Sequence, residues 1–179
     1  MAFIPYYRIA LREIPQQYEG QRLLKVVRRS DMLLRKEVER IAWFFRREFD
    51  YDLVQFTKTD KTPYTAYLLA NEGNEHPRVW VGACCFRARD YADLGQQVEA
   101  LQWVWIHPYH RSKGLLKGLW PTLCENHGDF IVEEPLSPSM KQFLLKHSRG
   151  SVFHPIYEGK KPNVKKMKAQ LALIDKSKV

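Results

Sequence analysis

The sequence predicts an α+β fold in which helices flank a mixed, mostly antiparallel sheet. One early segment has helical hydrophobic periodicity, and four later segments are rich in aromatic and β-branched residues, with turn-like stretches between them. Strand-like and helix-like segments then alternate to the end of the chain. The 179 residues, of which 45% are hydrophobic, suffice for one packed domain. We expect a single domain over residues 1–158, followed by a basic tail over residues 159–179.

The first fifty residues are expected to contain one strand and two helices. Residues 6–14 precede Pro15 and are predicted to form a strand, and residues 16–29 a short helix. Ser30 is a suitable N-cap for the next helix. Over residues 31–49 the helical spacing of apolar side chains predicts an amphipathic helix with a basic outer side. The apolar stripe consists of Leu34, Val38, Ile41, Ala42, Phe45 and Phe49.

The middle of the chain is expected to be a strand meander that leads into a loop and a helix. Strands are predicted over residues 52–57, 64–71, 78–88 and 97–106. Cys84 and Cys85 lie in the third of these strands, and Trp103 and Trp105 in the fourth; all four are expected to pack in the core. A glycine-containing loop follows, and a helix is predicted from about Gly114 to His127.

The last third is expected to add two short strands and one capped helix. Residues 129–134 and 151–159 are predicted strands. Between them, Ser137 is placed to cap a helix and Pro138 suits its first turn. The lysine-rich segment from Lys160 is expected to be either a frayed helix or disordered.

The net charge of +9 is concentrated at the two ends of the chain. Residues 1–50 carry eleven basic and seven acidic residues (+4), residues 51–150 carry eleven of each, and residues 151–179 carry seven and two (+5). Basic surfaces attract nucleic acids and acidic proteins. We expect such a partner to contact the basic residues within 22–47 and 160–178; a solvated basic surface is the alternative.

The cysteine count and the hydropathy bear on location. Three cysteines argue against a disulfide scaffold and suit a reducing compartment. No apolar run reaches the roughly 18 residues of a membrane helix. The start lacks the basic and then apolar pattern of a signal peptide. We therefore expect a cytoplasmic protein that does not bind membranes.

A strand, a basic loop and a helix together form the most informative segment, residues 99–120. The loop His110–Gly114 contains Arg111 and Lys113 and leads directly into the predicted helix. Helix N-termini present unpaired N–H groups and a partial positive charge, so they bind phosphate groups. Gly114 lets an anion approach the backbone closely. The residues alone thus indicate either a pyrophosphate-binding loop or an exposed basic turn.

This segment resembles the acetyl-CoA site of the GNAT superfamily of N-acetyltransferases. Ile106, Pro108, Arg111 and Gly114 match the end of that family's fourth strand and its phosphate loop; Leu116 stands where the family has glycine or alanine. The order of elements also matches. The resemblance implies a GNAT-like fold, acetyl-CoA as cosubstrate and N-acetyltransferase activity. Its implied cosubstrate-binding residues are Trp105, Ile106, Arg111, Ser112, Lys113, Gly114, Leu115 and Leu116.

A narrower likeness appears in the segment LSPSMKQF. Ser137, Pro138, Lys141 and Phe143 match a motif of the cohesin-acetyltransferase group of the same superfamily, with Met140 in place of its glycine. The likeness is loose. We transfer no cohesin substrate from it.

For catalysis, the resemblance implies a carboxylate that accepts a proton from the attacking amine. The candidates are Glu99 on the fourth strand and Glu134 or Glu133 on the fifth; strand alternation places the last two on opposite faces. Gln102 cannot act as a base but can orient water. Many members use a tyrosine of the last helix as general acid, and this chain has none there. His147, Ser148 and Tyr157 are the alternatives.

The first functional hypothesis is an acetyltransferase with a macromolecular acceptor, such as a protein amine or an amine carried on RNA. There are two alternatives to it. The acceptor can instead be a small amine. A catalytically inactive GNAT-like protein, binding nucleic acid or an acidic protein through its basic ends, is the main alternative. A zinc site built from His107, His110, Cys124 and His127 has only its spacing in support, so we expect no metal.

Overall fold

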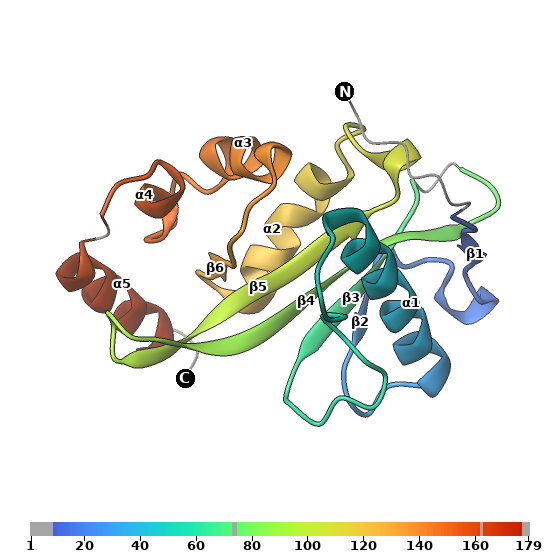
Figure 1. Ribbon diagram of the computed structural model, residues 1–179, viewed down its shortest axis with the longest axis horizontal. Coiled ribbons are helices and arrows are strands. Elements are labelled where there is room, and N and C mark those ends of the chain that lie inside the picture. The colour runs from blue at the N-terminus through green and yellow to red at the C-terminus, as the bar shows by residue number, and fades with distance from the viewer. Residues whose placement is uncertain (1–8, 73–74, 162, 177–179) are drawn as a thin grey trace. The chain divides into compact units, whose positions relative to one another are not determined.

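The structure, a computed structural model, describes residues 9–72, 75–161 and 163–176. It is an α+β fold with a mixed six-stranded sheet, which confirms the predicted fold class (Figure 1). Its elements are β1 (Arg12–Glu13), η1 (Gln16–Tyr18), β2 (Leu23–Val26), α1 (Met32–Phe49), β3 (Thr65–Ala70), β4 (Val79–Tyr91), β5 (Gln96–Ile106), η2 (Pro108–His110), α2 (Leu115–His127), β6 (Ile131–Val132), α3 (Pro138–His147), α4 (His154–Tyr157) and α5 (Val164–Lys176).

The chain divides into two compact units. Unit 1 comprises residues 1–87 and 102–118, and unit 2 comprises residues 88–101 and 119–179. Because the divisions fall inside β4, β5 and α2, each of these elements contributes to both units. The two units are described separately below.

Unit 1 is a sheet covered on one face by α1 (Figure 1). Its strand order is β2-β3-β4-β5, with β1 paired to β4. The predicted helix over residues 31–49 is confirmed as α1, which begins at Met32 because the Asp31 side chain caps it by accepting the Leu33 N–H at 2.7 Å. Of the predicted apolar stripe, all but Phe49 is buried against the sheet. Trp103 and Trp105 lie in the same core, as expected.

The segment before α1 differs from its prediction. Within the described part of the predicted strand over residues 6–14, only β1 is extended, and residues 6–8 lie outside the described residues. The predicted helix over residues 16–29 is wrong, since this segment forms η1 and then β2. Strand β2 pairs antiparallel with β3 and buries Leu24 and Val26. The stabilisation from this burial depends on β3, so local propensity does not reveal it. Ser30 is not the cap, because its Oγ accepts the Val27 N–H at 2.9 Å.

The predicted strand over residues 52–57 is also wrong. The segment is irregular. Val54 packs against the core, and Phe56 is buried in it, edge-on against Tyr64 at a ring distance of 4.8 Å. The start of this segment is attached to α1, because Arg46 of that helix donates a hydrogen bond to the Asp52 carbonyl at 3.0 Å. The aromatic content that indicated a strand therefore serves to close the core. The three strands predicted after it are confirmed as β3, β4 and β5.

Unit 2 contains the strand order β4-β5-β6 and the helices that follow. The predicted strand over residues 129–134 is present as the two-residue β6, which pairs parallel with β5 at Ala100 and Leu101. Its core includes Trp120, which contacts the rings of Phe130 and Phe143 edge-on at 5.3 and 4.9 Å. Ser137 caps α3 as predicted, since its Oγ accepts the Met140 N–H at 3.2 Å.

The end of unit 2 is helical, so the strand predicted over residues 151–159 is wrong. Phe153 and Tyr157 are both buried and lie four residues apart, a spacing that places them on one side of the short helix α4. The segment from Lys160 contains α5, whose Met167 is buried. No helix within the described residues is long and apolar enough to cross a membrane.

Candidate functional site

The predicted phosphate loop lies in unit 1, at the end of β5. The strand end is fixed to β4, because the His107 N–H donates to the Val81 carbonyl at 2.7 Å. The single turn η2 follows and its last N–H groups are used within the turn. Residues 111–114 then connect η2 to α2, so the loop spans only four residues between two helical segments. This brings the loop to the N-terminus of α2, as the sequence predicted.

The backbone of this loop has an unusual conformation at two of its four residues. Ser112 and Gly114 have φ values of 60° and 85°, in the left-handed region. Gly114 has open space where a side chain would begin. Ser112, Lys113 and Gly114 are exposed, and the first N–H groups of the 13-residue helix α2 have no partner within the helix. Such an exposed, charged helix N-terminus favours an anion.

Arg111 is bound within the protein. Its guanidinium forms a two-point ion pair with the carboxylate of Glu48 on α1, with N···O distances of 2.5 and 2.6 Å. Its Nε–H also donates to the Ile106 carbonyl at 2.7 Å. The guanidinium lies 5.7 Å from the ring centre of Trp105. Its charge is therefore neutralised by Glu48, and a phosphate group would have to compete with that carboxylate.

Glu48 is the main residue of this site that the sequence analysis missed. Its side chain is only 7% exposed, and it also accepts the Trp105 indole N–H at 2.7 Å. A signal was present, because Glu48 follows Ile41 and Phe45 by seven and three residues and so lies in phase with the apolar stripe of α1. A carboxylate on a buried helix face needs a partner.

The other predicted residues of this loop divide into exposed and buried groups. Trp105 is 2% exposed, so its side chain belongs to the core. Ile106 is half-buried and its carbonyl is taken by Arg111. Leu115 is buried and Leu116 is half-buried. Lys113 is consequently the predicted residue of the loop that offers an exposed positive side chain.

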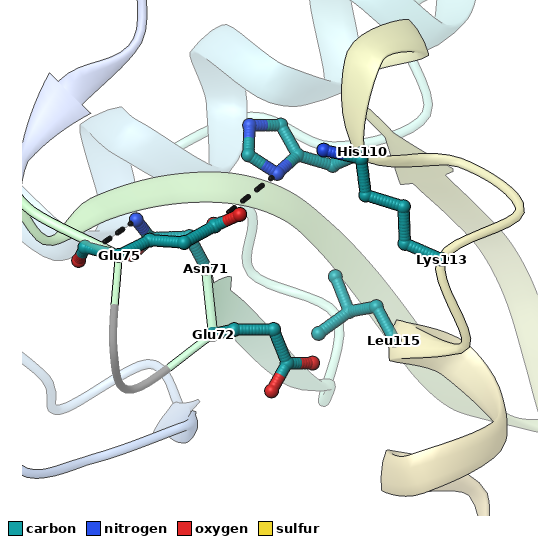
Figure 2. A pocket seen from close by; sticks show the side chains of 6 residues that line it. All are labelled: Asn71, Glu72, Glu75, His110, Lys113 and Leu115. Atoms are coloured by element: carbon teal, nitrogen blue, oxygen red, sulfur yellow. Dashed lines mark hydrogen bonds and ion pairs between the residues drawn. The ribbon is translucent and has the colours of Figure 1, made fainter.

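One small pocket adjoins the loop within unit 1 (Figure 2). It is lined by Asn71, Glu72, Glu75, His110, Lys113 and Leu115. Figure 2 shows the His110 ring directed toward the Glu75 carboxylate, with an Nδ1···Oε2 distance of 3.8 Å. Burial lowers the pKa of His110, whereas Glu75 acts in the opposite direction. The pocket thus sets two carboxylates beside the basic loop.

The predicted carboxylate bases lie in unit 2. Glu99 is 40% exposed and its Oε2 lies 3.1 Å from Nδ1 of His127, which is buried at the end of α2. Glu133 forms an ion pair with Arg89 at 2.5 Å. Glu134 is exposed. Glu99 is therefore the carboxylate of this set that a histidine orients, an arrangement suited to accepting and relaying a proton.

The alternatives for a general acid have structural partners. Tyr157 is buried and its hydroxyl oxygen accepts the Val132 N–H at 2.9 Å. Burial raises the pKa of Tyr157 well above its usual range. Ser148 is also buried and its hydroxyl donates to the Leu144 carbonyl at 2.7 Å. The His147 ring packs on Phe143 at 4.5 Å. None of these contacts singles out a proton donor.

The remaining polar residues give two observations. Gln102 has a buried side-chain oxygen with no hydrogen-bond partner among the described residues. Within the part of the chain that the structure describes, no three His, Cys, Asp or Glu side chains are grouped so as to hold a metal ion.

Comparison with known proteins gives structural similarities alone. No protein-family model and no curated protein matches the chain. Among solved structures it is similar to a ribosomal-protein-alanine N-acetyltransferase from Brucella melitensis (16% identity, 70% of this chain and 89% of that one, TM-score 0.48). It is also similar to a possible acetyltransferase from Clostridium difficile (12%, 72% and 90%, 0.45) and to the aminoglycoside N-acetyltransferase AAC(6')-Iy in complex with CoA (14%, 69% and 87%, 0.43).

The first and third of these proteins are N-acetyltransferases and the second is a possible acetyltransferase; the family that the loop sequence resembles also consists of N-acetyltransferases. Each TM-score lies below 0.5, which is too low a similarity to argue from. The likeness to the cohesin-acetyltransferase group has no counterpart among them.

Alanine substitutions at Gly114 and Gly118 should change the free energy of unfolding in opposite directions. Gly114→Ala places a side chain at a φ of 85° and should lower the free energy of unfolding by about 1 kcal/mol through backbone strain. Gly118→Ala lies inside α2, and the added methyl group would stand 3.6 Å from Nη2 of Arg22, an ordinary contact, so this substitution should raise the free energy of unfolding by up to about 1 kcal/mol. Urea denaturation checks both. Equal effects would contradict the left-handed conformation at Gly114.

His107 should make the folded protein less stable at acidic pH. Burial lowers its pKa, and the nearby charges of His110 and Arg111 lower it further, so the unfolded chain binds this proton more readily. Stability should therefore fall as the pH drops below about 6.5, by about 1.4 kcal/mol for each unit by which that pKa is lowered. His107→Asn keeps an acceptor for the Tyr109 N–H but cannot bind this proton, so its stability should fall less on acidification than that of the wild type.

The measurement is thermal unfolding of both proteins at pH 7.5 and pH 5.5, together with an NMR titration of the His107 ring. A ring that titrates at or above the ordinary histidine pKa would contradict this prediction.

Proposed function

We propose that the chain is an acetyl-CoA-dependent N-acetyltransferase that acts on an amine of a macromolecule. The observation that carries the proposal is the loop at the end of β5. It combines the residues that resemble the GNAT phosphate loop with two left-handed residues, an exposed lysine and a helix N-terminus. Taken together, these features suit a pyrophosphate group better than an ordinary turn.

The fit to a CoA phosphate is good for the backbone and partial for the side chains. Open space at Gly114 and the N–H groups at the start of α2, which have no partner within the helix, suit a bulky anion. Lys113 would add charge. Arg111, in contrast, is held by Glu48, and half-buried Leu116 replaces the small residue of the family pattern. The proposed binding residues are accordingly the main chain of residues 112–116 and Lys113.

The chemistry asks little more of the protein. Acetyl-CoA, when bound, supplies an activated acyl group that an amine can attack directly. The amine must first lose its proton, and Glu99 is the proposed acceptor because the adjacent His127 can orient the carboxylate and take the proton onward. Glu134 is the alternative acceptor. The departing thiolate can be protonated by water, so the absence of a tyrosine in α3 does not exclude the reaction.

The basic surface supports a macromolecular acceptor with negative charge. Many of the basic side chains in residues 22–47 have internal roles, since Arg22, Arg35, Arg40 and Arg46 bind a carboxylate or backbone carbonyls. Other basic side chains of this region and several lysines near the C-terminus are exposed: Lys25, Arg28, Arg29, Lys36, Lys161, Lys165, Lys166 and Lys168. A protein or RNA acceptor would be attracted to these cations.

The second candidate is a catalytically inactive protein that binds nucleic acid or an acidic protein. The neutralised Arg111 favours it, because a dedicated phosphate loop is expected to present its arginine. Salt-dependent binding of RNA without any affinity for acetyl-CoA would distinguish it from the enzyme.

Isothermal titration with acetyl-CoA tests the proposed function. We expect binding by the wild-type protein and roughly tenfold weaker binding by Lys113→Gln, the loss expected for one hydrogen bond to a charged group. Lys36→Gln, an exposed lysine on α1, is the matched control and should bind like the wild type. A folded wild-type protein that gives no binding heat would refute the acetyltransferase proposal. Release of free thiol with candidate acceptors then identifies the substrate.

A further inference from the structure

Glu48 and Arg111 form a closed network at the base of the loop. The buried Glu48 carboxylate accepts three hydrogen bonds, two from Arg111 and one from the Trp105 indole. Arg111 in turn donates to the Ile106 carbonyl at the last residue of β5. Helix α1, the end of β5 and the start of the loop are thereby joined through one side chain from each. The contacts all lie within unit 1.

The network decides what Arg111 can do. If a phosphate group drew Arg111 away, it would leave the Glu48 carboxylate buried with only the Trp105 N–H for a partner. The Glu48 side chain is 7% exposed and that of Arg111 35%, so the cost falls on the carboxylate, which is strongly disfavoured when it loses its charged partner in a buried site. Arg111 should therefore stay in place when a ligand binds.

The loop conformation depends on this anchor. Ser112 follows Arg111 directly and has a φ of 60°, which is unfavourable for a residue with a side chain and persists only where the surroundings impose it. Arg111 is fixed at three of its N–H groups immediately before this residue. We take the ion pair as the constraint that holds the next residues, Ser112 to Gly114, in this exposed conformation.

We propose that Glu48 is a positioning residue: it holds Arg111 so that the loop main chain and Lys113, rather than the Arg111 side chain, bind the phosphate groups of the cosubstrate. This inference rests on the proposed function for the identity of the ligand. The role of Glu48 in ordering the loop does not depend on the ligand.

The direction in which Glu48→Gln changes the affinity for acetyl-CoA distinguishes an Arg111 that anchors the loop from an Arg111 that binds phosphate. Glu48→Gln keeps the shape and an acceptor for Trp105 but removes the charge. If Glu48 positions the loop, acetyl-CoA binding should weaken roughly tenfold, as is typical when a group that orients a binding element is lost. If Arg111 instead binds phosphate directly, losing its counterion should make acetyl-CoA bind more tightly.

A double-mutant cycle adds a second criterion. Arg111→Met should weaken binding about as much as Glu48→Gln, and the double variant should be no weaker than either alone, because both remove one shared anchor. Additive losses, or tighter binding by Glu48→Gln, would overturn the proposal. The matched control is Glu39→Gln. Glu39 lies on the same helix as Glu48 and pairs with Lys58, which lies outside that helix, so its loss should leave the affinity unchanged.

Hydrogen exchange without ligand keeps the test independent of the proposed function. Glu48→Gln should speed exchange of the hydrogen-bonded amides that flank the loop, those of His110, Arg111 and Gly118, at least tenfold while the amides of β3 remain protected. Glu39→Gln should leave all of these exchange rates unchanged. Unchanged loop exchange in folded Glu48→Gln would overturn the positioning role. If the wild type fails to bind acetyl-CoA but the loop exchange responds as expected, the proposed function fails and the anchor stands.

Discussion

A carboxylate removed from water must be paired and hydrogen-bonded, and Glu48 meets this requirement by joining three parts of unit 1. Its carboxylate oxygens accept hydrogen bonds from the Arg111 guanidinium and the Trp105 indole, so one carboxylate connects α1, β5 and the loop after β5. The loop owes its position to this pairing, since Arg111 is the residue at which the loop begins. The same pairing removes the most obvious positive charge from the anion site, which leaves recognition to the main chain and to Lys113.

The elements that the sequence predicted correctly are those whose own residues determine them. Helix α1 has an apolar stripe that repeats at helical spacing from Leu34 to Phe45, and Ser137 specifies the start of α3 by local hydrogen bonding. The three wrong segments depend on distant partners. Strand β2 forms by pairing with β3, and Phe56 packs against Tyr64 instead of joining a sheet. Tyr157 of α4 is buried, and its hydroxyl accepts the N–H of Val132, 25 residues earlier. Propensity is a weak guide wherever burial against another element decides.

The candidate site shows the same division. Its loop, the glycine at a left-handed position and the exposed lysine could be predicted, because they are local features next to a helix start. The neutralisation of Arg111 could not, since its partner lies 63 residues earlier in the chain. Sequence phase marked Glu48 as buried, but nothing local identified the arginine that it would meet. Charge counts mislead for the same reason, because several arginines of the basic N-terminal region bind internal carbonyls and carboxylates.

The central claim is that the loop over residues 112–116 binds the phosphate groups of acetyl-CoA through its main chain. The most direct measurement is a titration of ¹⁵N-labelled protein with acetyl-CoA, followed by the amide resonances. The account predicts saturable shifts that are largest at Ser112, Lys113, Gly114, Leu115 and Leu116, with little change at the Arg111 guanidinium resonance. Saturable shifts that avoid this loop, or a spectrum that acetyl-CoA leaves unchanged, would contradict it.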